Sequence, residues 1–146
     1  MKGAIGKGQV KRSIEETHVS SFVAALVVGA LSIFALFVHE IFEPTEAGAF
    51  PFVLGFFCIY WTFVAALYLL LAIAPPMRRL DLAGCLLNVA VGMVLCSALP
   101  IIIMQGEGEP SILGLALGLF QGAGLGATFR WHINSKRLGA TTQQGR

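Results

Sequence analysis

Four long apolar stretches separated by short polar segments dominate the pattern of this chain. They cover residues 19–38, 52–74, 82–104 and 112–129, and none contains a charged residue. A hydrocarbon core of about 30 Å takes about 20 helical residues at a rise of about 1.5 Å each. Strands are a poor alternative because open sheet edges leave backbone groups unpaired in lipid. The pattern therefore predicts an all-α integral membrane fold, a four-transmembrane-helix bundle with an up-down-up-down arrangement.

The link between the second and third stretches carries clear helix signals. Pro75 and Pro76 follow the second stretch and are expected to end its helix, because proline lacks a backbone donor. Asp81 precedes the third stretch and is placed to cap the N-terminus of its helix. With links this short, helices that are neighbours in sequence are expected to pack antiparallel.

The two ends of the chain are polar. Ser13 and Glu16 have the spacing of a capping box, so we expect the first helix to begin at Ser13. The polar tails 1–12 and 139–146 are expected to be mobile. The sequence thus predicts a single membrane domain over residues 1–146.

Composition narrows the possible functions. Hydrophobic residues make up 56% of the chain and charged residues 12%, with a mean hydropathy of +0.79. An ordinary soluble domain has about 25% charged residues. This argues against a soluble enzyme, a disordered segment, a disulfide scaffold and a nucleic-acid-binding module. The expected environment is the lipid bilayer.

The charged residues predict the orientation. All ten Lys and Arg residues lie before the first stretch, between the second and third, or after the fourth. The two remaining links contain five of the eight acidic residues and no basic one. The positive-inside rule then places the N- and C-termini in the cytoplasm. We expect the protein in a plasma or inner membrane.

The fourth stretch has glycine at every fourth position, which places these residues on one face of a helix. They are Gly114, Gly118, Gly122 and Gly126. In the third stretch, Gly84 and Gly92 share a similar face. Bare backbone allows a neighbouring helix to approach closely. We therefore predict helix packing at these glycines, either between the third and fourth helices or with another subunit.

Asn88 and Gln121 are the side-chain amides within the apolar stretches. An amide that faces lipid is costly, so both are predicted to point inward as buried polar residues. The structural interpretation is a hydrogen bond between helices. The functional alternative is a polar path through the membrane.

The sequence gives a weak indication of a metal site and shows none of the common catalytic motifs. His39 and Glu43 are four residues apart and are the weak candidates for a metal ion. A metal site needs three or four converging ligands, so we predict none. A Ser-His-Asp set, HExxH, CxxC and a phosphate loop are all missing from the sequence. No cofactor is indicated.

One segment resembles a known family of transporters. A glycine-rich stretch of small four-span fluoride channels is similar to the residues Gly122, Gly126, Ala127, Arg130 and Trp131. Asn88 is similar to their membrane asparagine. However, Ala123 stands in place of a second glycine, and the stretch opens those chains but closes this one. The topology alone also resembles MARVEL-type tetraspan proteins, and neither resemblance assigns a family.

The leading functional hypothesis is a non-enzymatic accessory subunit. It would assemble through its glycine-rich faces as a homo-oligomer, or with other membrane subunits in a larger complex. The alternative is a small oligomeric channel or carrier lined by Asn88 and Gln121 with the hydroxyl groups of Ser32, Thr62 or Ser97. A second alternative is a component of a membrane enzyme that handles a lipid-soluble substrate, with a partner supplying the chemistry.

Overall fold

The structure, a computed structural model, describes residues 7–46, 48–103 and 112–144. These ranges form four α-helices and one short 3-10 helix. The elements are α1 (Lys7–Phe42), α2 (Phe50–Ala72), η1 (Pro75–Arg78), α3 (Leu82–Ile103) and α4 (Ile112–Gln144). The all-helical prediction is confirmed. Three helices, α1, α2 and α4, are long and apolar enough to cross a membrane, and α3 contributes a shorter apolar helix, Leu82–Ala98.

The first and last helices of the chain, α1 and α4, are longer than the sequence signals indicate. α1 begins at Lys7 and α4 continues to Gln144, so most of the expected tails is helical. The prediction that the first helix begins at Ser13 is wrong, because Ser13 lies inside α1 and its carbonyl accepts a hydrogen bond from the Thr17 hydroxyl at 2.7 Å. Adding a turn to an existing helix avoids the cost of nucleation. A polar segment next to an anchored helix can therefore stay helical.

The link between α2 and α3 follows the predicted signals. α2 ends at Ala72, and Pro75 opens η1. The Asp81 carboxylate accepts a hydrogen bond from the Gly84 backbone N–H at 3.0 Å, so Asp81 caps α3 as predicted. Met77 of η1 is buried. The link is therefore packed against the helices.

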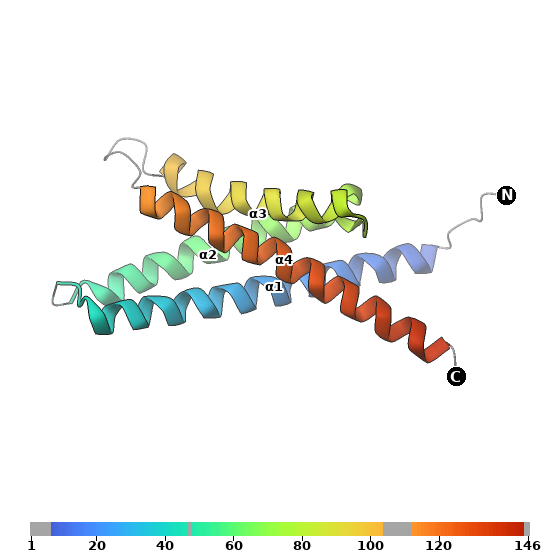
Figure 1. Cartoon of the computed structure of the whole chain (residues 1–146), viewed down its shortest axis with the longest axis horizontal. Coiled ribbons are helices and arrows are strands. Elements are labelled where there is room, and N and C mark those ends of the chain that lie inside the picture. The colour runs from blue at the N-terminus through green and yellow to red at the C-terminus, as the bar shows by residue number, and fades with distance from the viewer. Residues whose placement is uncertain (1–6, 47, 104–111, 145–146) are drawn as a thin grey trace.

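The helices are not packed evenly against one another (Figure 1). α3 and α4 share the most extensive contact, α1 packs on both α4 and α2, and α2 touches α3 only slightly. η1, the N-terminal part of α1 and the C-terminal part of α4 lie at one end of the molecule, which we call the basic end. The C-terminal part of α1 and the N-terminal parts of α2 and α4 lie at the opposite end.

A small core joins the four helices. Tyr68 of α2 and Phe129 of α4 are fully buried, and their rings meet edge to face at 5.7 Å between centroids. Many large apolar side chains instead point outward. Phe52 and Phe120 are each 82% exposed and Ile59 is 74% exposed. Such a surface exceeds the apolar patches of soluble monomers. Together with the long apolar helices, it indicates a membrane protein.

Candidate functional site

The backbones of α3 and α4 meet at glycines of both helices. A Cβ atom on Gly92 would collide with the Gly122 backbone, and one on Gly122 would collide with the Gly92 backbone. A Cβ on Gly118 would lie 2.7 Å from the Cys96 carbonyl oxygen. Real Cβ atoms essentially never come within 3.0 Å of such atoms. Only glycine therefore permits the present separation of the two helices.

Of the three remaining predicted glycines, one belongs to the same contact and two do not. Gly126 belongs to the same contact, because a Cβ atom there would lie 2.5 Å from the Asn88 carbonyl oxygen. Gly84 lies against the Arg79 backbone at the start of α3. Gly114 is exposed at the start of α4. The face predicted from Gly114 to Gly126 is thus covered by α3 of the same chain over its last three glycines.

A further close contact joins α1 and α2, and the sequence analysis missed it. The Trp61 ring lies directly over Gly29, where a Cβ atom would collide with it. Trp61 Nε1 donates a hydrogen bond to the Ala25 carbonyl at 3.0 Å. Ser32 lies one turn beyond Val28 and donates to the Val28 carbonyl at 2.8 Å. Gly29 is a single glycine, so no repeat drew attention to it.

Asn88 is fully buried two turns into α3. Its Nδ2 donates hydrogen bonds to the Met77 carbonyl at 2.9 Å and to the Gly84 carbonyl at 2.8 Å. Its Oδ1 has no partner among the described residues. The amide therefore holds η1 against α3, and the bond leads to the link rather than to a second long helix.

Gln121 makes a bond between two long helices. Its Nε2 donates to Ser32 Oγ of α1 at 3.0 Å. The other hydroxyls considered for a path lie elsewhere: Ser97 donates to the Met93 carbonyl, and Thr62 to a carbonyl of its own helix on an exposed face. Among the residues suggested as path-lining, the structure brings Ser32 and Gln121 together and leaves the others apart.

Arg130 joins α4 to the link between α2 and α3. It is only 9% exposed, and its guanidinium donates hydrogen bonds to the Arg79 and Asp81 carbonyls, the latter at 2.9 Å. Trp131, its neighbour, is 67% exposed. An exposed Trp at the end of an apolar stretch is typical of an anchor at the membrane interface. Arg130 instead uses its charge to satisfy carbonyls at the start of α3.

The end opposite the basic end holds the weak metal candidates. His39 Nε2 lies 3.5 Å from Glu43 Oε2, and both side chains are largely exposed. Glu40 accepts hydrogen bonds from the Thr45 backbone and hydroxyl. The described ranges contain no group of three or more His, Cys, Asp or Glu residues that could hold a metal ion. Glu107 and Glu109, also expected at this end, lie outside the described residues.

Apolar grooves lie between the described helices, and two of them exceed 300 Å³ in volume. The first lies between α1 and α2 and has a volume of about 480 Å³. Small side chains form much of its wall, including Ala25, Ala30, Ala65 and Ala66. The second has a volume of about 330 Å³ and is lined by all four helices, with Tyr60 and Gln121 as its main polar residues. Both volumes lie in the range of small-molecule sites.

Comparison of the chain with protein-family models, with curated proteins and with solved structures finds no match.

Proposed function

We propose that this chain is an integral membrane protein that crosses the bilayer four times, up-down-up-down, with both termini in the cytoplasm. The N-terminal part of α1, the C-terminal part of α4 and η1 lie together at the basic end, and this supports the arrangement. The basic side chains then meet the cytoplasmic surface, in agreement with the positive-inside rule. An affinity tag on either terminus that is accessible from outside intact cells would contradict the topology.

We further propose that the protein is a non-enzymatic accessory subunit that assembles with itself or within a larger membrane complex. The observation that carries this proposal is the groove between α1 and α2, because its small side chains let another helix approach closely. The glycine face of α4 is a weaker candidate for the interface, because α3 already covers Gly118, Gly122 and Gly126. Assembly is therefore proposed through the α1–α2 groove.

The test is the mass of the full chain in mild detergent and in lipid nanodiscs, measured by native mass spectrometry. Self-assembly predicts multiples of the 15.6 kDa chain. Ala66→Leu fills the groove and should lower the assembled fraction. Ala116→Leu, at an exposed alanine of α4 outside the groove, is the matched control and should have no effect. A wild-type chain that stays single at every concentration would contradict self-assembly.

The groove lined by all four helices favours a second function, a carrier or channel for a small solute. Its walls are apolar, and Gln121, bonded to Ser32, supplies a polar group inside it. A few polar groups in an apolar pocket are typical of small-molecule sites. Gln121→Leu should abolish solute flux into liposomes, with Ala116→Leu as the control. Unchanged flux in a folded Gln121→Leu variant would remove this function.

A further inference from the structure

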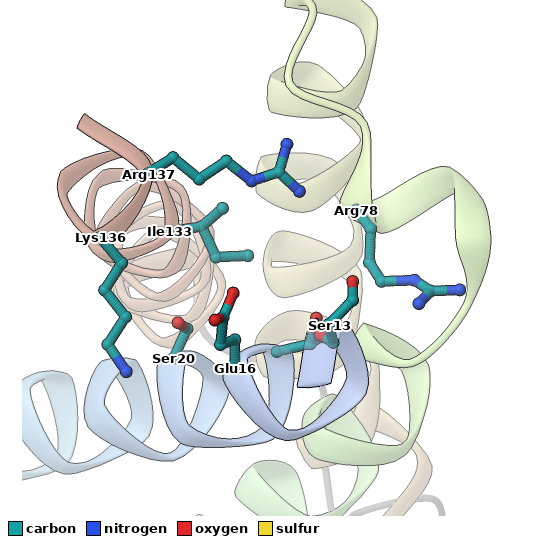
Figure 2. A pocket seen from close by; sticks show the side chains of 8 residues that line it. Ser13, Glu16, Ser20, Arg78, Ile133, Lys136 and Arg137 are labelled. Atoms are coloured by element: carbon teal, nitrogen blue, oxygen red, sulfur yellow. Dashed lines mark hydrogen bonds between the residues drawn. The ribbon is translucent and has the colours of Figure 1, made fainter. Parts of the chain in front are cut away.

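A polar cleft opens at the basic end, where α1, η1 and α4 meet (Figure 2). We call it the basic cleft. Its polar lining includes Ser13, Glu16 and Thr17 of α1, Arg78 of η1, and Lys136 and Arg137 of α4. Three of these side chains are cationic and one is anionic, so the lining is net positive. In Figure 2 the Arg137 side chain extends from α4 toward the side on which Arg78 lies.

The three elements around the basic cleft are fixed by hydrogen bonds. Ser20 Oγ of α1 lies 2.9 Å from His132 Nδ1 of α4, which ties the two long helices together beside the cleft. Asn88 holds the Met77 carbonyl, next to Arg78 in η1. Arg130 holds the carbonyls that follow η1. These hydrogen bonds hold the elements that carry the three cations next to one another.

The depth of the cleft matches that of lipid headgroups. In the proposed topology, the apolar part of α1 begins near Val19. Glu16 and Ser13 lie three and six residues before it, which corresponds to roughly 5–9 Å at the helical rise. The headgroup layer on each side of the hydrocarbon core is about 5–8 Å thick. A phosphate ester at this depth would lie beside the mouth of the cleft.

The cleft itself has a volume of about 10 Å³, which is room for about one water molecule, so a larger ligand can lie only at its mouth. We propose that the mouth of the basic cleft binds the phosphate group of an anionic phospholipid headgroup. Arg78 can offer paired N–H donors to phosphate oxygens, and Lys136 and Arg137 add positive charge to the lining. Glu16 opposes an anion, but Arg12 lies 3.4 Å from its carboxylate and offsets part of its charge. The choice of a lipid over free phosphate rests on the proposed membrane topology.

The experiment measures binding to the purified full chain in neutral detergent. Three probes separate the sources of phosphate: phosphatidylglycerol, phosphatidylcholine and inorganic phosphate. Retained lipid is counted by native mass spectrometry, and inorganic phosphate is titrated by calorimetry. We expect phosphatidylglycerol to bind most tightly. Each of Arg78→Gln, Lys136→Gln and Arg137→Gln should weaken its binding about fivefold, the usual effect of one basic residue at an anionic surface.

Two further variants make the result specific to the cleft. Glu16→Gln should strengthen binding of phosphatidylglycerol over phosphatidylcholine, because it removes the one anionic side chain of the lining. Lys11→Gln removes an equal charge from an exposed position on another face of α1 and should change binding by less than about twofold. Circular dichroism checks that each variant keeps its helices.

The outcomes divide clearly. Equal losses for Lys11→Gln and the cleft variants would show general surface charge and overturn the site, as would unchanged or weaker binding by Glu16→Gln. Tight inorganic phosphate binding that the same variants weaken would support the phosphate site and reassign its source. The assay does not depend on membrane orientation. A negative result in the binding assay would therefore leave the proposed topology intact. A terminus found to be accessible from outside cells would likewise leave the binding site intact.

Discussion

Gly126→Ala tests whether contact between glycine backbones determines the separation of α3 and α4. A Cβ atom at this position would lie 2.5 Å from the Asn88 carbonyl oxygen and 2.6 Å from Val89 Cα. Ordinary contacts of a Cβ atom begin at 3.4 Å. The helices must therefore move apart locally by roughly 0.9 Å, since backbone atoms cannot rotate away as a flexible side chain can.

Two opposing effects set the size of the result. Overpacking typically costs about 1–3 kcal/mol, and three backbone atoms within 2.6 Å place Gly126 toward the upper end. Replacing a helical glycine by alanine contributes up to about 1 kcal/mol in the other direction. We expect a net loss of about 1–2 kcal/mol in the free energy of unfolding. Gly139→Ala in the same helix meets nothing within 4 Å, so only the favourable effect remains there.

Reversible unfolding in mixed micelles of mild detergent and dodecyl sulfate, followed by circular dichroism, measures both variants. Gly126→Ala should unfold at a lower mole fraction of dodecyl sulfate than the wild type, and Gly139→Ala at an equal or higher one. The mass of the assembled protein should not change, because the contact lies within one chain. Equal shifts for the two variants would refute the backbone-contact argument. A lower mass for Gly126→Ala without loss of stability would move the contact to a subunit interface.

Further substitutions test three polar contacts. Asn88→Leu leaves the Met77 carbonyl without its donor and should cost about 1–3 kcal/mol in the same unfolding assay; an unchanged midpoint would show that the bond contributes nothing. Trp61→Phe removes the bond to the Ala25 carbonyl and should cost about 1 kcal/mol. Phe57→Leu removes the ring that stacks on Trp61 but leaves this bond in place, so it measures the effect of the stacked ring alone. Arg130→Lys keeps the charge but not the two-pronged donor geometry, so trypsin should cleave the link between α2 and α3 faster in detergent, and equal cleavage rates would contradict this role.

The sequence predicts the helical class of this fold because apolar length and helix-ending residues are local signals. Pro75 and Asp81 mark the ends of neighbouring helices, and the structure bears out both. The extent of α1 could not be predicted in this way. A capping box at Ser13 competes with continuation of a helix that is already nucleated, and continuation prevails.

The partners of the candidate residues are less predictable than their identity. A glycine at every fourth position indicates a flat helix face, but it does not say which backbone covers that face. Gly29 gives no repeat, yet Trp61 covers it. Arg130 could not be linked to the Arg79 and Asp81 carbonyls, because a sequence does not show which backbone groups a side chain of a distant helix can reach.

The glycine contact joins two helices of the same chain, so another molecule must bind at a different surface. The backbones of α3 and α4 are too close for any third helix to enter between them at the glycine contact. Gln121 and His132 form bonds between long helices, and Asn88 and Arg130 form bonds to the link between α2 and α3. Together these bonds continue from the middle of the bundle to the basic end. α2 is the least constrained long helix, because it packs mainly on α1 and only slightly on α3. Both of the larger apolar grooves are bounded by α2, so a partner helix or a solute that binds in either groove would contact α2 directly.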